Sequence, residues 1–199
     1  MDCRRCLTPL VALALCATPV QALDWSIGAN LGVSVVHRPG RAGGITHWGL
    51  PAGAGPGGYS HGTLAGLRGG VLTESGQHGI FLDGGYRSSR RGDSGEDSYQ
   101  ITANYEYALL RIPHIWSPYL TAGWGGNHSG YSYSAQYHLG ASSATYGAGA
   151  GVRYRVRRDH GVLRGELRYD WVDGASDQGT ILIARSSSVA LKLGFDLWL

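Results

Sequence analysis

Apolar and polar residues alternate with a period of two in eight separate stretches of this sequence. In residues 25–35, for example, Trp25, Ile27 and Leu31 fall on one side of an extended chain, and Asn30 falls on the other. Successive side chains of a β-strand point to opposite faces, so the alternation predicts a strand with one apolar face. The remaining stretches lie at residues 59–72, 80–86, 99–109, 118–124, 146–156, 163–171 and 188–199.

The distribution of apolar residues also indicates which kind of membrane-spanning structure the chain could form. After residue 22 the sequence has no run of about 18 apolar residues, the length that a membrane-spanning helix needs. The strands of a membrane β-barrel alternate and cross the apolar layer in about 9–11 residues. The 33 glycines and 12 tyrosines among 199 residues suit strands joined by turns. We therefore predict an all-β fold, an eight-stranded antiparallel up-and-down transmembrane β-barrel.

The connections between these stretches alternate in length. The odd-numbered connections are long, at residues 37–58, 87–98, 125–143 and 173–187, and the even-numbered ones are short, at residues 73–78, 111–117 and 157–161. Outer-membrane barrels have long loops outside the cell and short turns in the periplasm. We expect the same orientation here, with both chain termini in the periplasm.

The aromatic residues fall at two heights of the predicted barrel. Near the long loops lie Tyr59, Tyr86, Tyr99, Trp124, Tyr146, Tyr169 and Trp171, and near the short turns lie Trp25, Tyr107, Tyr154 and Phe195. Amphipathic rings collect at membrane–water interfaces, so this distribution predicts two aromatic belts. A soluble eight-stranded barrel of the lipocalin kind also alternates, but its apolar face points inward and it needs no such belts. The belts favour the membrane barrel.

The first 22 residues have the features of a cleavable signal peptide. The basic pair Arg4-Arg5 precedes an apolar stretch at residues 7–16, and small residues occupy the positions before residue 23. We expect residues 1–22 to be removed and residues 23–199 to form the barrel domain, with lipidation at Cys16 as the alternative. Because all three cysteines precede residue 23, a mature chain would hold neither a disulfide nor a reactive thiol.

Two internal segments and the last strand resemble those of a known group of proteins. The segments are residues 117–125, with the sequence SPYLTAGWG, and residues 147–155, with the sequence GAGAGVRYR. In them, and in its alternating C-terminal strand, the chain resembles the small outer-membrane β-barrel superfamily, which includes the OmpA transmembrane domain, OmpX and the opacity-type surface proteins. The resemblance implies a Gram-negative outer membrane, contact with its lipid and lipopolysaccharide, and insertion by the barrel-assembly machinery.

The polar faces of the predicted strands carry charged residues, which a closed barrel would turn toward its lumen. These residues are Glu106, Arg153, Arg155, Arg164, Glu166, Arg168, Lys192 and Asp196, together with Arg68, Asp83, Arg87 and Asp170. An eight-stranded barrel has room only for its own side chains, so we expect opposite charges to pair and fill it. A narrow ion path through this network is the alternative.

The partner of Glu166 depends on the register of the sixth hairpin. A two-residue turn at residues 159–160 would place Arg153 opposite Glu166 across the ladder. A one-step change of register would place Arg155 opposite Glu166 instead, and the sequence leaves both pairings open.

Histidines in the predicted loops do not form a pattern that is typical of a catalytic or metal site. His128 and Ser129 are neighbours in sequence, so in a strand they would point to opposite faces and could not act together. Ten residues separate His37 from His47, and His128 from His138, a spacing that is not a metal-ligand signature. We expect no catalytic residue, no cofactor and no metal.

The second predicted long loop carries an arginine cluster. Arg87, Arg90 and Arg91 could bind lipopolysaccharide phosphates, since arginine contacts phosphate bidentately, or they could form a solvated hairpin tip. The formal net charge of +3 is too small to indicate a nucleic-acid partner.

We expect a monomeric outer-membrane protein with a structural or surface-interaction role through its extracellular loops. The first alternative is a narrow passive channel of the porin-like kind, which a continuous water path through the lumen would favour. The second is an outer-membrane enzyme that modifies lipid A. A serine, a histidine and a carboxylate within hydrogen-bond reach at the lipid-facing outer rim would favour that enzyme.

Overall fold

A computed structural model of the chain describes residues 23–38, 41–48, 59–61, 66–91, 94–133, 137–157, 160–177, 180–183 and 185–199. The predicted signal peptide, residues 1–22, lies outside these ranges. Within them, no helix has the length and apolar character that crossing a membrane requires.

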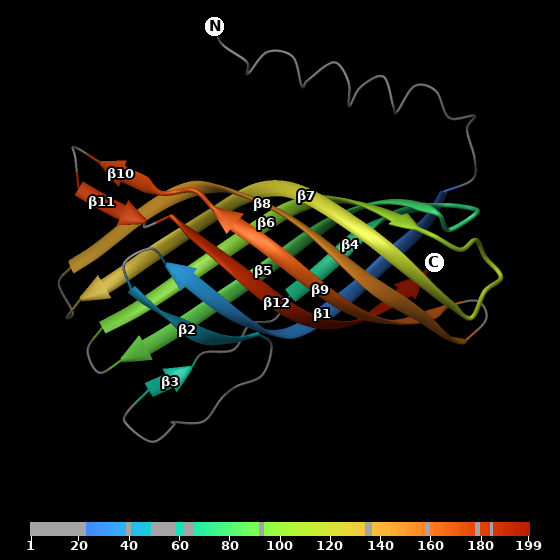
Figure 1. The fold of residues 1–199 in the computed structure, drawn as a ribbon, viewed down its shortest axis with the longest axis horizontal. Coiled ribbons are helices and arrows are strands. Elements are labelled where there is room, and N and C mark those ends of the chain that lie inside the picture. The colour runs from blue at the N-terminus through green and yellow to red at the C-terminus, as the bar shows by residue number, and fades with distance from the viewer. Residues whose placement is uncertain are drawn as a thin grey trace, which may run out of the picture.

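Eight long strands form a closed antiparallel barrel in which each strand pairs with its neighbours in sequence (Figure 1). The strands are β1 (Leu23–Arg38), β4 (Gly66–Thr73), β5 (His78–Arg91), β6 (Ser94–Ala108), β7 (Trp116–Tyr133), β8 (Tyr137–Arg157), β9 (Gly161–Val172) and β12 (Ser186–Trp198). The last strand, β12, pairs with β1 over twelve residues and closes the barrel, from Ser26↔Trp198 to His37↔Ser187. The predicted all-β, eight-stranded up-and-down fold is confirmed.

The register of the strands fixes the width of the barrel. Starting from Trp25 of β1, each residue was followed to its paired residue on the next strand until β1 was reached again at Val35. The successive partners are Val71, Ile80, Tyr105, Ala122, Ala148, Tyr169 and Val189. The register is therefore offset by ten residues around the barrel, which for eight strands corresponds to a strand tilt of about 40°. A barrel of this size encloses only its own side chains.

The two ends of the barrel differ. At the end that we call the turn end, residues 74–77 and 109–115 connect the strands, β8 ends at Arg157 before β9 begins at Gly161, and the described chain ends at Leu199. The opposite end, which we call the hairpin end, carries four further strands: β2 (Arg41–Trp48), β3 (Tyr59–His61), β10 (Ala175–Asp177) and β11 (Thr180–Ile183). Of these, β2 pairs with β1, β3 pairs with β5, and β10 pairs with β11.

The prediction that residues 87–98 and 125–143 are loops is wrong. The β5–β6 ladder continues to Arg91↔Ser94, and the β7–β8 ladder continues to Tyr133↔Tyr137. Because β8 pairs with β9 only from Thr145 onward, strands β5 to β8 extend past β9 as a protruding sheet. Continued pairing satisfies the backbone hydrogen bonds of these segments, which a loop would leave to water. The predicted strand at residues 59–72 also divides, into β3 and β4.

The outward face is apolar and the inward face is polar, as the alternation predicts. Leu67, Ile101 and Trp124 are each about two-thirds exposed on the outside, whereas Asn104 and Thr102 are buried on the inside. Some inward positions must be glycine. Gly147 is paired with Asp170, and Gly28 with Asp196, and a Cβ atom at either glycine would overlap the carboxylate of its partner.

We expect Gly147→Val to destabilise the barrel by about 1–3 kcal/mol or to prevent its assembly, because the valine would displace Asp170 in a filled interior. Urea unfolding in detergent micelles, followed by tryptophan fluorescence, measures the effect. Gly126→Val is the matched control on the outward face, where a Cβ atom would meet nothing within 4 Å. Its effect should stay below about 0.5 kcal/mol, and equal losses for the two variants would contradict the assignment of faces.

Candidate functional site

The lumen holds two groups of buried charged residues, and the first is centred on Glu106. Glu106 is fully buried, and its carboxylate accepts hydrogen bonds from Arg68 of β4 and Arg153 of β8. Asp83 Oδ1 lies 3.9 Å from Arg68 Nε, and Asp83 Oδ2 accepts a 2.7 Å hydrogen bond from Asn104 Nδ2. We call these five residues the β6 cluster.

The second group is centred on β9. Arg164 Nε donates to Asp196 Oδ2 at 2.9 Å, and a second nitrogen of Arg164 donates to Asn30 Oδ1. Arg168 Nε donates to Asp170 Oδ1 at 2.6 Å. Glu166 lies between the two arginines, 3.6 Å from Arg164 Nη1 and 3.8 Å from Arg168 Nη1. Residues Asn30, Arg164, Glu166, Arg168, Asp170 and Asp196 form what we call the β9 cluster.

Tyr119 of β7 lies between the two clusters. Its hydroxyl donates to Glu166 Oε2 at 2.9 Å, and its ring centroid is 5.4 Å from the guanidinium carbon of Arg153. Only 1% of Tyr119 is exposed. The buried side chain of Tyr119 thereby connects the β6 cluster to the β9 cluster, and the charged groups form one network.

Neither pairing considered for Glu166 occurs. Arg153 is opposite Arg164, Arg155 is opposite Val162, and Glu166 is opposite Gly151. The β8–β9 ladder begins at Arg157↔Gly161, one residue from the register that a two-residue turn would give, and a register shift between Arg155 and Arg157 displaces it by one residue more. Arg153 pairs with Glu106 instead.

Three residues of the predicted lumen network remain: Lys192 on β12, Arg155 at the turn end of β8, and Arg87, whose side chain lies outside the described set. Lys192 is buried on β12, opposite Glu166 in the β9–β12 ladder. Arg155 is half-buried near the turn end, and its guanidinium carbon lies 5.1 Å from the centroid of the Trp198 ring.

Apolar side chains close the lumen at the turn end. Leu72, Phe81, Val162 and Trp198 form a buried cluster, and Ile112 of the connection 109–115 packs against it. The backbone amide of Ile112 donates to Ser75 O at 3.1 Å, which holds this connection beneath the barrel.

This closure is not predicted by the alternation, which assigns the inward face to polar residues. A signal was present in the sequence. Phe81 lies between Ile80 and Leu82, and Trp198 lies between Leu197 and Leu199, so that apolar residues occupy both faces there.

Exposed aromatic residues form two rings around the outward face. The hairpin-end ring contains Tyr99, Trp124, Tyr146, Tyr169 and Trp171, and the turn-end ring contains Trp25, Tyr107, Tyr154 and Phe195. Tyr86 is half-buried, with its ring 4.8 Å from that of Tyr99, and the side chain of Tyr59 lies outside the described set. Tyr99 and Tyr107 lie eight residues apart on β6, so the rings are separated by about 20 Å along the barrel axis.

A histidine and a serine meet at the outward hairpin end, although not the pair adjacent in sequence. His128 Nδ1 lies 3.0 Å from Ser142 Oγ, and both residues are exposed. Among the described side chains no carboxylate forms a hydrogen bond with either residue, so only two of the three groups expected of a serine hydrolase are present there. The side chains of His37, His47 and His138 lie outside the described set. No cluster of three potential metal ligands occurs among the residues described.

No family model matches the sequence, and no curated protein matches it. Solved structures match its fold. Neisserial surface protein A (NspA) superposes with a TM-score of 0.64 and 15% identity, covering 89% of this chain and 99% of that one. A major outer membrane protein from Thermus thermophilus superposes with a TM-score of 0.54 and 12% identity, covering 90% of this chain and 100% of that one. Ail, the attachment invasion locus protein of Yersinia pestis, superposes with a TM-score of 0.50 and 16% identity, covering 89% of this chain and 97% of that one.

We expect Glu106→Gln to lower the free energy of unfolding by about 3–5 kcal/mol, because it leaves Arg68 and Arg153 buried without the carboxylate that they share. Urea unfolding in micelles measures the loss. Glu74→Gln removes an exposed carboxylate from a turn-end connection and should change stability by less than about 0.5 kcal/mol. A network that contributes nothing to stability would give the same small effect at both positions.

Proposed function

We propose that this chain, which has the fold of the small outer-membrane β-barrels, is a bacterial outer-membrane protein with a structural or surface-interaction role. In this role the hairpin end faces the outside of the cell and the turn end, with both ends of the barrel domain, faces the periplasm. Membrane lipid and lipopolysaccharide surround the barrel, which inserts through the barrel-assembly machinery and works as a monomer.

The observation that carries the membrane location is the apolar outward face between two aromatic rings. A soluble barrel would leave this surface in water, where a large contiguous apolar patch is unfavourable. The separation of about 20 Å between the rings is close to the apolar band of an outer-membrane barrel, about 25 Å tall. Side chains such as Trp124 and Tyr99 suit the boundary between lipid tails and headgroups.

The filled lumen supports a structural role over transport. The β6 and β9 clusters occupy the middle of the barrel, and Leu72, Phe81, Val162 and Trp198 close its turn end. A continuous water path would have to pass both. The protruding sheet of strands β5 to β8 is then the part of the molecule that is available to a partner outside the cell. No described carboxylate completes the His128–Ser142 pair, so the enzyme alternative has less support.

Depth-dependent insertion tests the membrane location. Leu167 lies midway between the aromatic rings, four residues from both Leu163 and Trp171 on β9. An arginine on the lipid face costs about 2–4 kcal/mol at the middle of the bilayer and about 0–1 near its surface. We therefore expect Leu167→Arg to reduce the amount of heat-modifiable folded barrel in the outer membrane, and Leu163→Arg to have little effect. Normal assembly of Leu167→Arg would mean that residue 167 does not face the lipid interior.

Cysteine labelling in whole cells tests the orientation. We expect Ser94→Cys, in the β5–β6 hairpin, to react with a membrane-impermeant maleimide on intact cells, and Glu74→Cys, in the β4–β5 connection, to react only after permeabilisation. The unsubstituted chain, whose only cysteines precede residue 17, gives the background. Labelling of Glu74→Cys alone on intact cells would mean that the orientation is reversed.

A further inference from the structure

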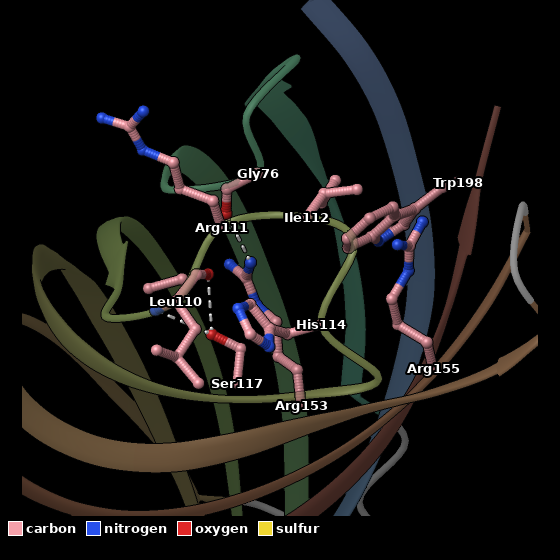
Figure 2. Close-up of a pocket in the computed structure, with 10 residues that line it drawn as sticks. Gly76, Leu110, Arg111, Ile112, His114, Ser117, Arg153, Arg155 and Trp198 are labelled. Carbon is pink, nitrogen blue, oxygen red and sulfur yellow. Dashed lines mark hydrogen bonds between the residues drawn. The ribbon is translucent and has the colours of Figure 1, made fainter.

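A small cavity lies beside the apolar closure, between the lumen and the connection 109–115 (Figure 2). Its volume is about 20 Å³, and its lining includes Arg153 and Arg155 of β8, Ser117 of β7 and Trp198 of β12. A cavity of this volume holds a single water molecule or an ion of similar size.

The inward-facing arginines differ in their ion pairs. On the side of the β9 cluster, three cations face three carboxylates: Arg164, Arg168 and Lys192 face Glu166, Asp170 and Asp196. On the other side, Arg68 contacts Asp83 and Glu106, and Arg153 contacts Glu106. Within the described part of the chain, Arg155 is the inward arginine that forms no ion pair with a carboxylate.

Arg155 makes few polar contacts among the described residues. Its Nε atom is closed off from solvent and makes no hydrogen bond, and its guanidinium faces the ring of Trp198 (Figure 2). Three other described carboxylates lie near the turn end: the half-buried Asp24, the exposed Glu74 and the terminal carboxylate of Leu199. None of them forms an ion pair with Arg155 in the described part of the chain. A partly buried cation without a counter-charge is unfavourable, and a bound anion removes that cost.

Other cationic groups make the surroundings of the cavity more positive. Arg153 also lines it; its Nη2 atom contacts Glu106 Oε1, and its Nη1 atom donates a 3.1 Å hydrogen bond to Gly76 O. His114 and Arg111, both exposed, belong to the connection that covers the cavity. Arg111 is occupied by a 2.6 Å hydrogen bond to Gln77 and points away from Arg155 in Figure 2.

We propose that this cavity is a binding site for a monatomic anion, chloride or another halide, held by the guanidinium group of Arg155. The anion supplies a counter-charge to Arg155, and it fills the space between the lumen and the connection 109–115. The site is independent of the surface role proposed above.

Bromide quenching of Trp198 fluorescence tests the site, because bromide quenches an indole ring on contact and Trp198 lines the cavity. The full-length protein, purified from membranes in a non-ionic detergent, is titrated with sodium bromide against sodium gluconate at constant ionic strength. The contribution of Trp198 is the difference between the wild-type protein and Trp198→Phe. We expect this contribution to saturate with bromide, and Arg155→Gln to raise the bromide concentration at half-saturation at least tenfold.

Arg185→Gln is the matched control, since it removes an exposed arginine outside this cavity and should leave the quenching curve unchanged. Heat-modifiable gel mobility establishes that each variant is folded. If Trp198→Phe does not fold, the melting temperature is measured in sodium chloride and in sodium gluconate instead. We expect chloride to raise the melting temperature of the wild type but not that of Arg155→Gln. Quenching that is linear in bromide, or equal in wild type and Arg155→Gln, or a melting temperature indifferent to chloride, would mean that the cavity holds only water.

Discussion

The pairing of β12 with β1 is the constraint on which the rest of this structure depends. It removes the two free edges of the sheet, and the return to β1 ten residues further along sets the tilt and the narrow bore. With the apolar faces turned outward, the interior has to accept the polar faces of all eight strands. Crowding on the inner face of adjacent strands explains why Gly28 and Gly147 have no side chain beside their partners Asp196 and Asp170.

The charged interior follows from the same geometry. Burying a single charge is costly, whereas a charge that is paired and hydrogen-bonded is tolerated. Glu106 therefore needs both Arg68 and Arg153, and Tyr119 links these groups to Glu166 on the far side. A network of this kind depends on the register, because a strand displaced by one residue would turn its charged side chains toward the apolar surroundings.

The two ends of the barrel serve different purposes in the role that we propose. At the turn end, Ile112 and the Leu72, Phe81, Val162 and Trp198 cluster close the lumen, and the small cavity beside them gives Arg155 a counter-charge if it holds an anion. At the hairpin end, strands β5 to β8 continue past β9 and offer a paired, protruding sheet. In the proposed role, a barrel that is closed at its turn end and extended at its hairpin end is better suited to presenting a surface to a partner than to transport.

Local periodicity determined much of this protein from the sequence by itself. The period of two is a property of each strand alone, so the number of barrel strands, the outward face and the exposed aromatic residues such as Trp124 and Tyr154 could be predicted. Pairing between strands is not local. The start of the β8–β9 ladder at Arg157↔Gly161 and the shift between Arg155 and Arg157 place Arg153 opposite Arg164, and Arg153 pairs with Glu106, not Glu166. The pairing of residues 87–91 with 94–98 and of 125–133 with 137–143 was likewise decided only by the tertiary structure, as was the inward turn of Phe81 and Trp198. The neighbours of a strand determine which of its backbone groups are satisfied and which of its faces is enclosed.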